Sequence, residues 1–348
     1  MRALITGGAG FIGCNLTRYL ADRGHAVRVL DSLARPGSER NLAWLRATLG
    51  PALEVVQADV RDAAAVRAAA AGADVIFHLA AQVAVTTSVA DPVHDFEVNA
   101  RGTLNVLEAA RQHGCAVFYT STNKVYGGLE TVPVVEHATR YAYADRPQGI
   151  DEAQPLDFHS PYGCSKGAAD QYVRDYARIY GLRTVVFRMS CIYGPRQFGN
   201  EDQGWVAHFV IAAALGRPLT IYGDGKQVRD LLHVDDLLRA FALAYERLDR
   251  TAGQVYNLGG GPANALAVWA ECGPLLEELL GRPIPVRYGP WRPGDQKVYV
   301  SDVRRAATFG WQPTIPAREG IAHLLRWVQD HRHLFDVAAP SAGTAPAG

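Results

Sequence analysis

A glycine-rich turn close to the N-terminus constrains the fold of this chain more than any other feature. The apolar run 3–6 predicts a buried strand, and the spacing of Leu16, Tyr19 and Leu20 predicts the helix that follows. The candidate cofactor-binding residues in the turn between them are Gly7, Gly10, Phe11, Ile12 and Gly13. Glycines let the backbone approach a diphosphate, whose charge is favoured at a helix N-terminus. This strand, turn and helix therefore predict a dinucleotide-binding unit.

A carboxylate follows the turn at the spacing that such units use. The second predicted strand, 27–30, ends in Asp31, about 20 residues beyond the glycines. A carboxylate at this offset accepts hydrogen bonds from the adenine ribose hydroxyls and repels a 2′-phosphate, so the sequence favours NAD over NADP. Arg35 lies close enough in the sequence to keep NADP as an alternative.

Strands and helices continue to alternate up to about residue 190. Further strands are predicted at 53–57, 75–79, 116–120 and 183–189, with helices at 62–71 and 93–112 and from Pro161 to Gly181. Six strand–helix units predict an α/β fold, namely a Rossmann-like doubly wound parallel sheet with helices on both faces.

Beyond residue 190 the shorter elements predict a smaller, interleaved α/β lobe. They are helix 203–215, strand 219–222, helix 234–247, strand 254–258, and helices after Asn264, Ser301 and Ala317. We expect an NAD-binding domain over 1–190, with contributions from about 228–260, and a mostly substrate-binding lobe over 191–335. The tail, 337–348, is poor in bulky apolar residues and is expected to be disordered.

Residues at the carboxyl ends of the predicted strands are candidates for cofactor contact, because open α/β sheets bind ligands at that edge. Asp59 and Val60 follow the third strand and suit an adenine amino group and ring. The fourth strand ends in Leu79, Ala80 and Ala81, whose mostly small side chains let a flat cofactor lie close. A buried strand end explains these residues equally well. The amide of Asn99, within helix 93–112, is placed with the cofactor site in a supporting role.

Tyr162 and Lys166 form a candidate acid/base pair. They lie four residues apart after Pro161, which is typical of a helix start, so they share one helix face. A phenol of pKa about 10 exchanges protons poorly near neutrality, and an adjacent ammonium lowers that pKa. The pair predicts a general acid/base for alcohol–ketone interconversion, although an isolated match is usually an exposed helix pair. Thr122, after the fifth predicted strand, adds a hydroxyl that can hold the reacting group.

Three arginines of the second lobe predict a phosphate-bearing substrate. Arg196, Arg229 and Arg292 fall in predicted loops. Arginine donates paired hydrogen bonds to phosphate, so three arginines on one lobe suggest a nucleotide-bearing substrate, although each alone is typical of a surface ion pair. The segment 127–158, which precedes Tyr162, is too long for a plain connection and is either a surface insertion or a lid.

Composition excludes several classes of function. Lys+Arg and Asp+Glu number 35 each, so the formal net charge is zero and no global field attracts nucleic acid or an anionic membrane. The five cysteines are scattered without Cys-x-x-Cys spacing, which disfavours a disulfide framework or a zinc site. Since no signal peptide or membrane-spanning apolar run is visible, we expect a cytoplasmic protein.

Several motifs together resemble the extended short-chain dehydrogenase/reductase family of nucleotide-sugar epimerases and dehydratases. These motifs lie at 6–13, 78–82, 162–166, 228–230 and 233–236. Within the family, four stretches are similar to the CDP-paratose 2-epimerase (CDP-tyvelose epimerase) group, namely 121–127, 156–172, 196–198 and 202–206. The resemblance covers the chain from its first residue to about residue 331.

The resemblance implies an isomerase that keeps NAD bound and inverts C2 of a nucleotide-diphosphate sugar, such as a CDP-hexose, through a transient 2-keto sugar and enzyme-bound NADH. Tyr162 would be the catalytic acid/base, Lys166 its electrostatic partner and a cofactor contact, and Thr122 a hydroxyl on the reacting sugar. The implied contacts to the diphosphate and ribose of the nucleotide are Arg196, Arg229, Arg292 and Asp295, and the candidate sugar contacts are Gln82, Thr86, Asn123 and Lys124. Relatives commonly associate, so a homo-oligomer is expected.

The residues after Thr122 bear on the type of reaction. The 4,6-dehydratases of the family place an Asp-Glu pair there, whereas this chain has Asn123 and Lys124. Neither side chain is a carboxylic acid, so dehydration is disfavoured, whereas epimerisation needs only hydride transfer and the Tyr162 proton. A 4-epimerase of the same family is the alternative, because the same residues could oxidise C4 in another pose. The other possibilities are a net dehydrogenase that releases NADH and a non-catalytic NAD-binding scaffold.

Overall fold

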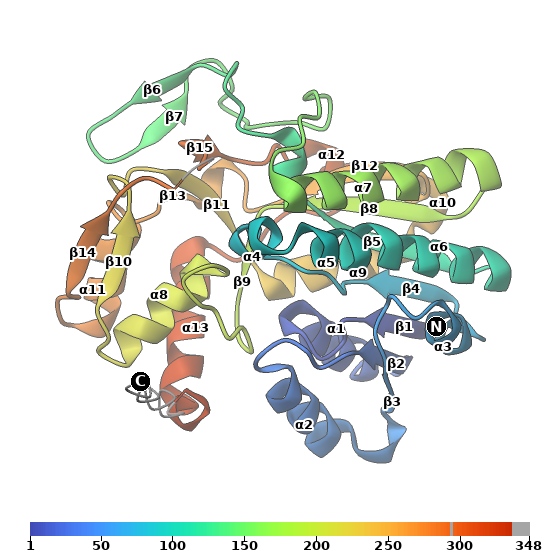
Figure 1. Cartoon of the computed structure of the whole chain (residues 1–348). Helices are drawn as coiled ribbons and strands as arrows, with labels where there is room; N and C mark the ends of the chain where they lie inside the picture. The colour runs from blue at the N-terminus through green and yellow to red at the C-terminus, as the bar shows by residue number, and fades with distance from the viewer. Residues whose placement is uncertain (293–294, 336–348) are drawn as a thin grey trace, which may run out of the picture.

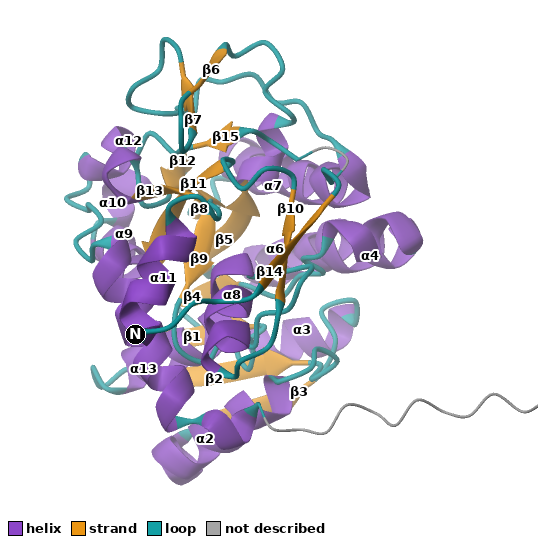
Figure 2. Cartoon of the chain, turned by 90° about the vertical axis from the view of Figure 1, so that its left-hand side faces the viewer, coloured by secondary structure: helices purple, strands orange, loops and turns teal. Residues whose placement is uncertain are grey.

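A seven-stranded parallel sheet dominates the structure, and helices cover both of its faces (Figures 1 and 2). The computed structural model describes residues 1–292 and 295–335, so the tail 337–348 lies outside the described residues. The strand order is β12-β8-β5-β4-β1-β2-β3, and the Rossmann-like fold is confirmed. The strands are β1 (Arg2–Thr6), β2 (Ala26–Asp31), β3 (Glu54–Gln57), β4 (Val75–His78), β5 (Ala116–Thr122), β8 (Thr184–Met189) and β12 (Gln254–Leu258).

Each face of the sheet has its own apolar layer, because successive strand residues point to opposite sides. On one face Ile5 and Phe118 pack with residues of α1 (Phe11–Ala21) and α9 (Val234–Glu246). On the other face Leu4 and Val117 pack with residues of three helices, namely α3 (Ala63–Ala70), α6 (Gly102–His113) and α7 (Ser160–Tyr180).

The helix predicted over 93–112 is interrupted. The structure has α5 at Pro92–Phe96, a π-helical turn, η2, at Glu97–Arg101, and then α6. Asn99 lies in this turn, and its side-chain nitrogen donates to the carbonyl oxygen of Gln82 at 3.0 Å. Such turns inside α-helices are frequent at functional sites. Here the turn directs the amide to the segment that follows β4.

The smaller lobe mixes helices with short strands. Its helices, α8 (Trp205–Ala214), α11 (Cys272–Leu280) and α13 (Ala317–Asp330), share an apolar core with β10 (Leu219–Tyr222). β10 pairs with β14 (Val286–Gly289), and a second sheet joins β9 (Cys191–Tyr193), β11 (Val228–His233), β13 (Ala265–Ala267) and β15 (Val298–Tyr299). Both parts of the chain also contain shorter or peripheral elements. The helices not yet named are α2 (Ser38–Leu49), α4 (Val85–Ala90), α10 (Leu248–Thr251) and α12 (Arg304–Ala307), and the 3₁₀ turns are η1 (Gly50–Ala52), η3 (Asn123–Tyr126), η4 (Pro262–Asn264) and η5 (Arg332–Leu334).

Two sequence predictions for this lobe are wrong. The segment after Asn264 is β13 rather than a helix, because it pairs with β11 in antiparallel register, and the first α-helix after it is α11. Arg229 lies in the strand β11 rather than in a loop. All six residues of β11 are buried. Because three of them are Arg, Asp and His, the sequence lacks the continuous apolar run that is typical of a buried strand.

The long segment before α7 is a structured insertion on the second lobe. It contains the hairpin β6 (Val134–Glu136) and β7 (Tyr141–Tyr143), at the top of Figure 1. The Tyr143 hydroxyl donates to the carbonyl oxygen of Val298 at 2.9 Å, and the Ile150 amide donates to that of Val300 at 2.8 Å. These bonds attach the insertion to the strand β15 and the residue after it, which favours a surface insertion over a lid.

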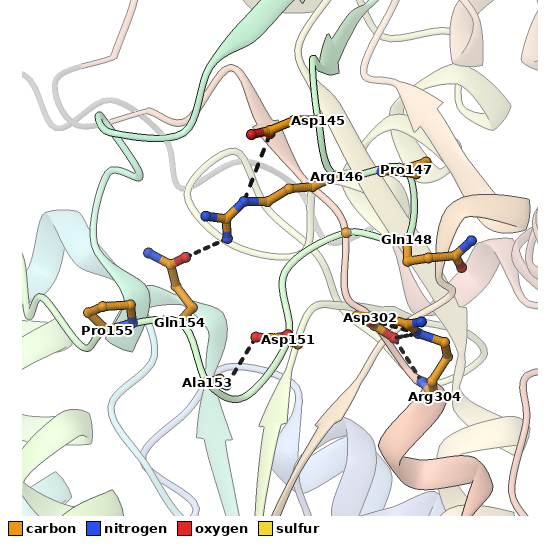
Figure 3. A pocket seen from close by; sticks show the side chains of 11 residues that line it. Asp145, Arg146, Pro147, Gln148, Asp151, Ala153, Gln154, Pro155, Asp302 and Arg304 are labelled. Atoms are coloured by element: carbon orange, nitrogen blue, oxygen red, sulfur yellow. Dashed lines mark hydrogen bonds and ion pairs between the residues drawn. The ribbon is translucent and has the colours of Figure 1, made fainter.

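A surface pocket of about 440 Å³ lies between this insertion and the segment that begins α12 (Figure 3). Arg146 donates to Gln154 at 2.7 Å, and Arg304 pairs with Asp302 at 3.0 Å. The charges of the pocket are therefore satisfied among its own residues, and its lining includes neither Tyr162 nor Lys166. Among the helices of residues 1–292 and 295–335, none combines the length and the apolar character that crossing a bilayer requires.

Candidate active site

The carboxyl end of β5 faces the first turns of α7, and this junction brings the predicted acid/base residues together. Tyr162 and Lys166 are both buried, with 9% and 3% of their surface exposed. Pro161 occupies the first turn of α7, where its missing amide hydrogen costs nothing. The side chain of Thr122, the last residue of β5, lies close enough to the Tyr162 hydroxyl to lower the pKa of the phenol. Tyr162 and Thr122 therefore meet as the sequence suggested, and β5 extends two residues beyond its predicted end.

An adjacent ammonium was expected to lower the pKa of Tyr162, but in this structure that pKa is raised. Burial raises the pKa of Tyr162 to about 12, the Thr122 side chain and the charge of Arg35 oppose that rise, and the Asp95 carboxylate adds to it. The Lys166 ammonium instead donates to the carbonyl oxygen of Thr120 at 2.7 Å. Arg35, which the sequence left as a possible NADP contact, thus lies close enough to act on the phenol.

Lys166 is itself strongly perturbed. Burial lowers its pKa to about 7, against the opposing charges of Asp170 and Asp95. Its ammonium lies 4.3 Å from the centre of the Tyr119 ring, a distance at which a cation is attracted to an aromatic face. The lysine is therefore held by the strand, and its pKa lies near neutral pH, where a small change in its surroundings changes its charge.

Behind this pair, Asn99 joins a buried polar cluster. Its side-chain nitrogen lies 3.1 Å from Asp95 and 3.1 Å from the hydroxyl of Ser165, and its oxygen accepts from the Gln82 amide at 2.9 Å. The Gln82 side chain donates to Asp95 at 2.9 Å and to the carbonyl oxygen of Ala84 at 2.9 Å. These bonds favour a supporting role for Asn99 and leave Gln82, a predicted sugar contact, engaged within the protein.

α4 reaches the start of α7 through a residue that sequence reasoning missed. The Tyr162 amide donates to the hydroxyl of Ser88 at 3.1 Å, and Ser88 is fully buried. Thr86, the other predicted sugar contact on this helix, is exposed. No local pattern distinguishes Ser88 from the hydroxyl residues beside it, because its role arises only when α4 packs on α7.

The glycine turn is built for close approach of a diphosphate. Gly7 has φ +70°, and a Cβ added there would lie 2.7 Å from the amide nitrogen of Ala80. A Cβ on Gly13 would collide with the carbonyl oxygen of Gly7. The turn therefore packs tightly against the end of β4, where Leu79, Ala80 and Ala81 lie, and Phe11 and Ile12 form the first turn of α1.

Asp31 completes this cradle. Its carboxylate accepts hydrogen bonds from the amides of Ala9 at 2.9 Å and Leu33 at 2.8 Å. Burial raises its pKa, and these backbone bonds oppose the rise. The turn, the carboxylate and the helix N-terminus together fit a dinucleotide, as the sequence predicts.

The residues predicted near the adenine are less free. Asp59 forms an ion pair with Arg61 at 2.8 Å, and hydrogen bonds from Arg61 lower the Asp59 pKa against its desolvation. Val60 is 3% exposed and packs into the apolar layer with α3 and α6. Val60 is therefore a packing residue next to the end of β3, and Asp59 already has a cationic partner in Arg61.

Lys124, Arg229 and Asp295 meet beside the acid/base pair, whereas the three predicted arginines do not form one cluster. Arg229 donates to Asp295 at 2.6 Å. Burial, reinforced by the charge of Arg229, lowers the pKa of Lys124 to about 8, although Asp295 opposes this. Arg292 is one turn from Asp295, since its carbonyl oxygen accepts from the Asp295 amide at 3.2 Å, and its guanidinium lies 4.1 Å from the centre of the Tyr222 ring.

Arg196 stands apart from this group. Its guanidinium lies 4.2 Å from the centre of the Trp44 ring, on α2 of the larger domain, and 5.7 Å from that of Trp327. It also has φ +70°, which is uncommon for a residue other than glycine. Asn123, in contrast, begins η3 directly after Thr122, and its side-chain oxygen lies 3.4 Å from the Thr122 hydroxyl. The geometry therefore supports Asn123 as a neighbour of the reacting group more directly than it supports Arg196 as a diphosphate contact.

Groups of the kind that ligate metals gather in one other place among the described residues. Candidate ligand atoms of His233, Asp235 and His323 lie within 4.8 Å of one another. The two imidazole nitrogens that face each other are 3.3 Å apart, and the rings stack with centres 5.2 Å apart. At this distance one imidazole N–H can donate to the facing nitrogen, so a hydrogen bond between the two rings accounts for their approach.

Comparison with known proteins agrees with this geometry. The chain matches the NAD dependent epimerase/dehydratase family over residues 3–259. It is 45% identical to the CDP-paratose 2-epimerase of Salmonella typhi over 337 residues, which are 94% of this chain and 99% of that protein.

Solved structures share the whole architecture. The UDP-glucose 4-epimerase of Thermus thermophilus in complex with NAD superposes with a TM-score of 0.80 at 34% identity, covering 95% of this chain and 100% of that one. The dTDP-glucose 4,6-dehydratase DesIV of Streptomyces venezuelae, with NAD bound, gives 0.81 at 32% identity, covering 96% and 98%. With its glycine turn, Asp31 and Tyr162–Lys166 pair placed on that shared fold, the chain belongs to the NAD dependent epimerase/dehydratase family.

Proposed function

We propose that the chain is an NAD-dependent nucleotide-sugar 2-epimerase that acts on a CDP-linked hexose. The observation that carries the proposal is the meeting of Tyr162 and Thr122 next to Asn123 and Lys124, in a chain 45% identical to a CDP-paratose 2-epimerase. The first two residues supply proton transfer at a sugar hydroxyl. The next two lack the carboxylic acid that elimination of water from a sugar requires.

The residues of the chain divide the work. Tyr162 exchanges the proton of the reacting sugar hydroxyl, Thr122 holds the phenol in place, and Lys166 provides positive charge beside them. NAD, when bound, accepts a hydride from the sugar carbon and returns it. Its diphosphate would lie on the glycine turn at the N-terminus of α1, and Asp31 would accept the hydroxyls of its adenine ribose. Inversion follows if the 2-keto sugar turns its other face before the hydride returns.

The charged residues beside the site suit the diphosphate of the substrate. Arg229 is 8% exposed and already shares its charge with Asp295, which leaves the Lys124 ammonium as the more available cation. Arg292 extends the positive charge toward the surface from the segment next to Asp295. An anion between these groups would offset the cost of holding Lys124 in a partly desolvated position.

The direct test is incubation of the purified enzyme with a panel of sugars and identification of the products by NMR. CDP-paratose and CDP-glucose are expected to yield their 2-epimers without net accumulation of NADH. Steady release of NADH would indicate a dehydrogenase, and loss of water would indicate a dehydratase. A chain that binds NAD but converts no sugar of the panel would be a scaffold.

A 4-epimerase is the second candidate, because relatives with that name share much of the sequence. The UDP-glucose 4-epimerase of Mycolicibacterium smegmatis is 34% identical over 334 residues, which are 95% of this chain and 99% of that protein. Including UDP-glucose in the panel separates the two proposals. Formation of UDP-galactose with no reaction at C2 of any CDP-sugar would replace the first proposal by the second.

A further inference from the structure

The last three residues of β5 each contact a different turn of α7. The carbonyl oxygen of Thr120 accepts from Lys166 at 2.7 Å, the Ser121 hydroxyl donates to Asp170 at 2.8 Å, and the Thr122 side chain lies close enough to Tyr162 to lower its pKa. Residues 162, 166 and 170 are spaced by four, so they lie one above another on a single face of the helix. The strand end and the catalytic face of α7 are thus joined at three successive points.

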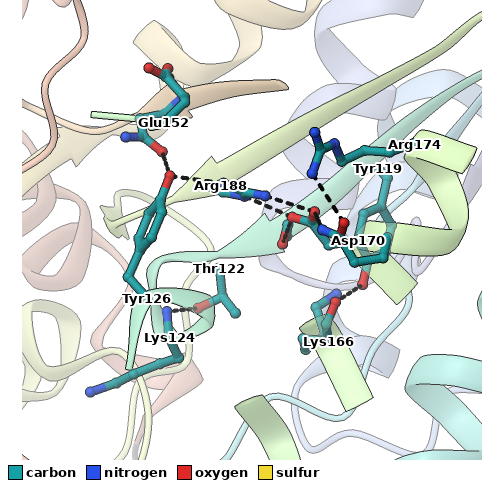
Figure 4. A network of polar contacts seen from close by, with 12 residues as sticks. Tyr119, Thr122, Lys124, Tyr126, Glu152, Lys166, Asp170, Arg174 and Arg188 are labelled. Carbon is teal, nitrogen blue, oxygen red and sulfur yellow. Dashed lines mark hydrogen bonds and ion pairs between the residues drawn. The ribbon is translucent and has the colours of Figure 1, made fainter. Parts of the chain in front are cut away.

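Arg188 closes this joint from the neighbouring strand (Figure 4). Arg188 lies on β8 in register with Ser121, and its guanidinium makes two parallel bonds to the Asp170 carboxylate, at 2.9 Å and 3.0 Å. Its third bond goes to the Tyr126 hydroxyl at 3.1 Å, which in turn donates to Asn257 at 2.7 Å. All of these side chains are at most 3% exposed. Paired charge-assisted bonds in such a dry position hold both partners in one orientation.

Asp170 also acts on Lys166 through its charge. Among the charged groups that shift the pKa of Lys166, Asp170 has the largest effect, and it favours the ammonium form against the burial that disfavours it. Asp95, from α5 on the opposite side, acts in the same direction. Arg188 pairs with the Asp170 carboxylate and so offsets part of its effect on Lys166.

We infer that Asp170, held by Arg188 and Ser121, is a positioning residue for the acid/base pair: it fixes the face of α7 that carries Tyr162 and Lys166 against the end of β5. The inference rests on the proposed function for its kinetic consequence, but not for its electrostatic one. Asp170 and Arg188 touch none of the reacting groups. They act through Lys166 and through the strand that ends in Thr122.

The electrostatic part is tested without any substrate. The lysines of the chain are Lys124, Lys166, Lys226 and Lys297, so ¹³C-labelled lysine gives an NMR spectrum in which Lys166 can be assigned by its own substitution. In Asp170→Asn, the pKa of Lys166 is expected to fall below its wild-type value, because the carboxylate that favours the ammonium is gone. An unchanged Lys166 titration in folded Asp170→Asn would overturn the inference. This readout is independent of turnover, so failure of the proposed function leaves it interpretable.

The positional part uses milder variants, because Asp170→Asn leaves the buried Arg188 without its counter-charge and its folding must be checked by thermal melting. Ser121→Ala removes one bond to Asp170 and strands no charge. It is expected to lower kcat about ten-fold with little change in KM for the nucleotide sugar, and Ser121→Thr is expected to restore kcat.

Thr184→Val is the matched control, because it deletes another buried bond between α7 and the sheet, away from Tyr162 and Lys166, from the Thr184 hydroxyl at the start of β8 to the carbonyl oxygen of Val173 at 2.8 Å. It should lower the melting temperature and leave kcat unchanged. Equal kcat in Ser121→Ala and wild type, or equal losses in Ser121→Ala and Thr184→Val, would contradict the positioning role, and this result decides the matter alone if Asp170→Asn does not fold.

Discussion

The ammonium of Lys166 lies 2.7 Å from the carbonyl oxygen of Thr120. A catalytic helix and a central strand of the sheet are therefore joined at the residue that supplies the positive charge, two positions before the hydroxyl of Thr122 meets Tyr162. The i, i+4 spacing alone suggests that Lys166 acts directly on the Tyr162 phenol. In the structure, the contact that anchors Lys166 and the contacts of the phenol are separate. Lys166 is anchored by the strand. The phenol of Tyr162 lies beside Thr122, and the charge of Arg35 opposes the rise in its pKa that burial causes.

Tyr162→Phe is expected to abolish epimerisation while sparing cofactor binding. The substitution removes the phenolic oxygen that exchanges the proton and retains the ring that fills the buried position, so a loss of about 10²-fold to 10⁴-fold in kcat is expected. Turnover and NAD affinity should be measured on the same preparation. Tyr172→Phe, on the exposed side of the same helix, is the matched control and should behave as wild type. A parallel loss of NAD affinity in Tyr162→Phe would count against the assigned role.

The affinity for the nucleotide sugar is expected to fall as the pH rises through about 8. The pKa of Lys124 in the free enzyme is about 8, and binding of the substrate diphosphate favours its ammonium and raises that pKa. The contribution of Lys124 is then complete below the free-enzyme value and is lost as the pH rises from there toward the value in the complex. The measurement is Kd for the CDP-sugar between pH 6.5 and 9.5.

Two variants of Lys124 make this pH dependence specific. Lys124→Arg keeps a charge that does not titrate in this range, so its Kd should stay flat where that of the wild type rises. Lys124→Gln should bind about ten-fold more weakly at pH 7 and also without the pH dependence. If all three proteins show the same slope of Kd against pH, another group is responsible and Lys124 is not the diphosphate contact.

Asp31→Ala is expected to weaken NAD binding by about ten-fold or more with the fold retained. The variant loses the acceptor for the ribose hydroxyls and also leaves the amides of Ala9, which is buried, and Leu33 without their carboxylate partner. Calorimetric titration with NAD measures the loss, and far-UV circular dichroism checks the fold. Asp22→Ala, at the surface end of α1, is a suitable control. Tight NAD binding in Asp31→Ala would show that the cradle holds the cofactor elsewhere.

Regular patterns made the larger domain predictable. The alternation of apolar strands with helices predicts the parallel sheet, and the Asp62 carboxylate caps α3 where the predicted helix begins. The π-helical turn at Asn99 was not predictable, because Asn99 bonds to partners in the segment after β4 and in α7. Likewise, β11 carries Arg229 and Asp230 at buried positions, which no rule of apolar periodicity would place in a strand interior.

At the site, residue types were easier to predict than their neighbours. Tyr162, Thr122 and the glycine turn are placed as their motifs suggested. The pKa of Tyr162 could not be read from its distance to Lys166 along the helix, because desolvation and the positions of Arg35 and Asp95 depend on tertiary packing. The same is true of Arg196, whose contact with Trp44 depends on how the second lobe meets α2.

The central claim is that inversion takes place at C2 with return of the same hydride. Its most direct test is incubation with CDP-glucose carrying deuterium at C2, followed by NMR of the recovered sugars. The account predicts a 2-epimer that retains the deuterium at C2. A product inverted at C4 whose deuterated C2 keeps its original configuration, or a 2-epimer whose C2 label has been lost to solvent, would contradict it.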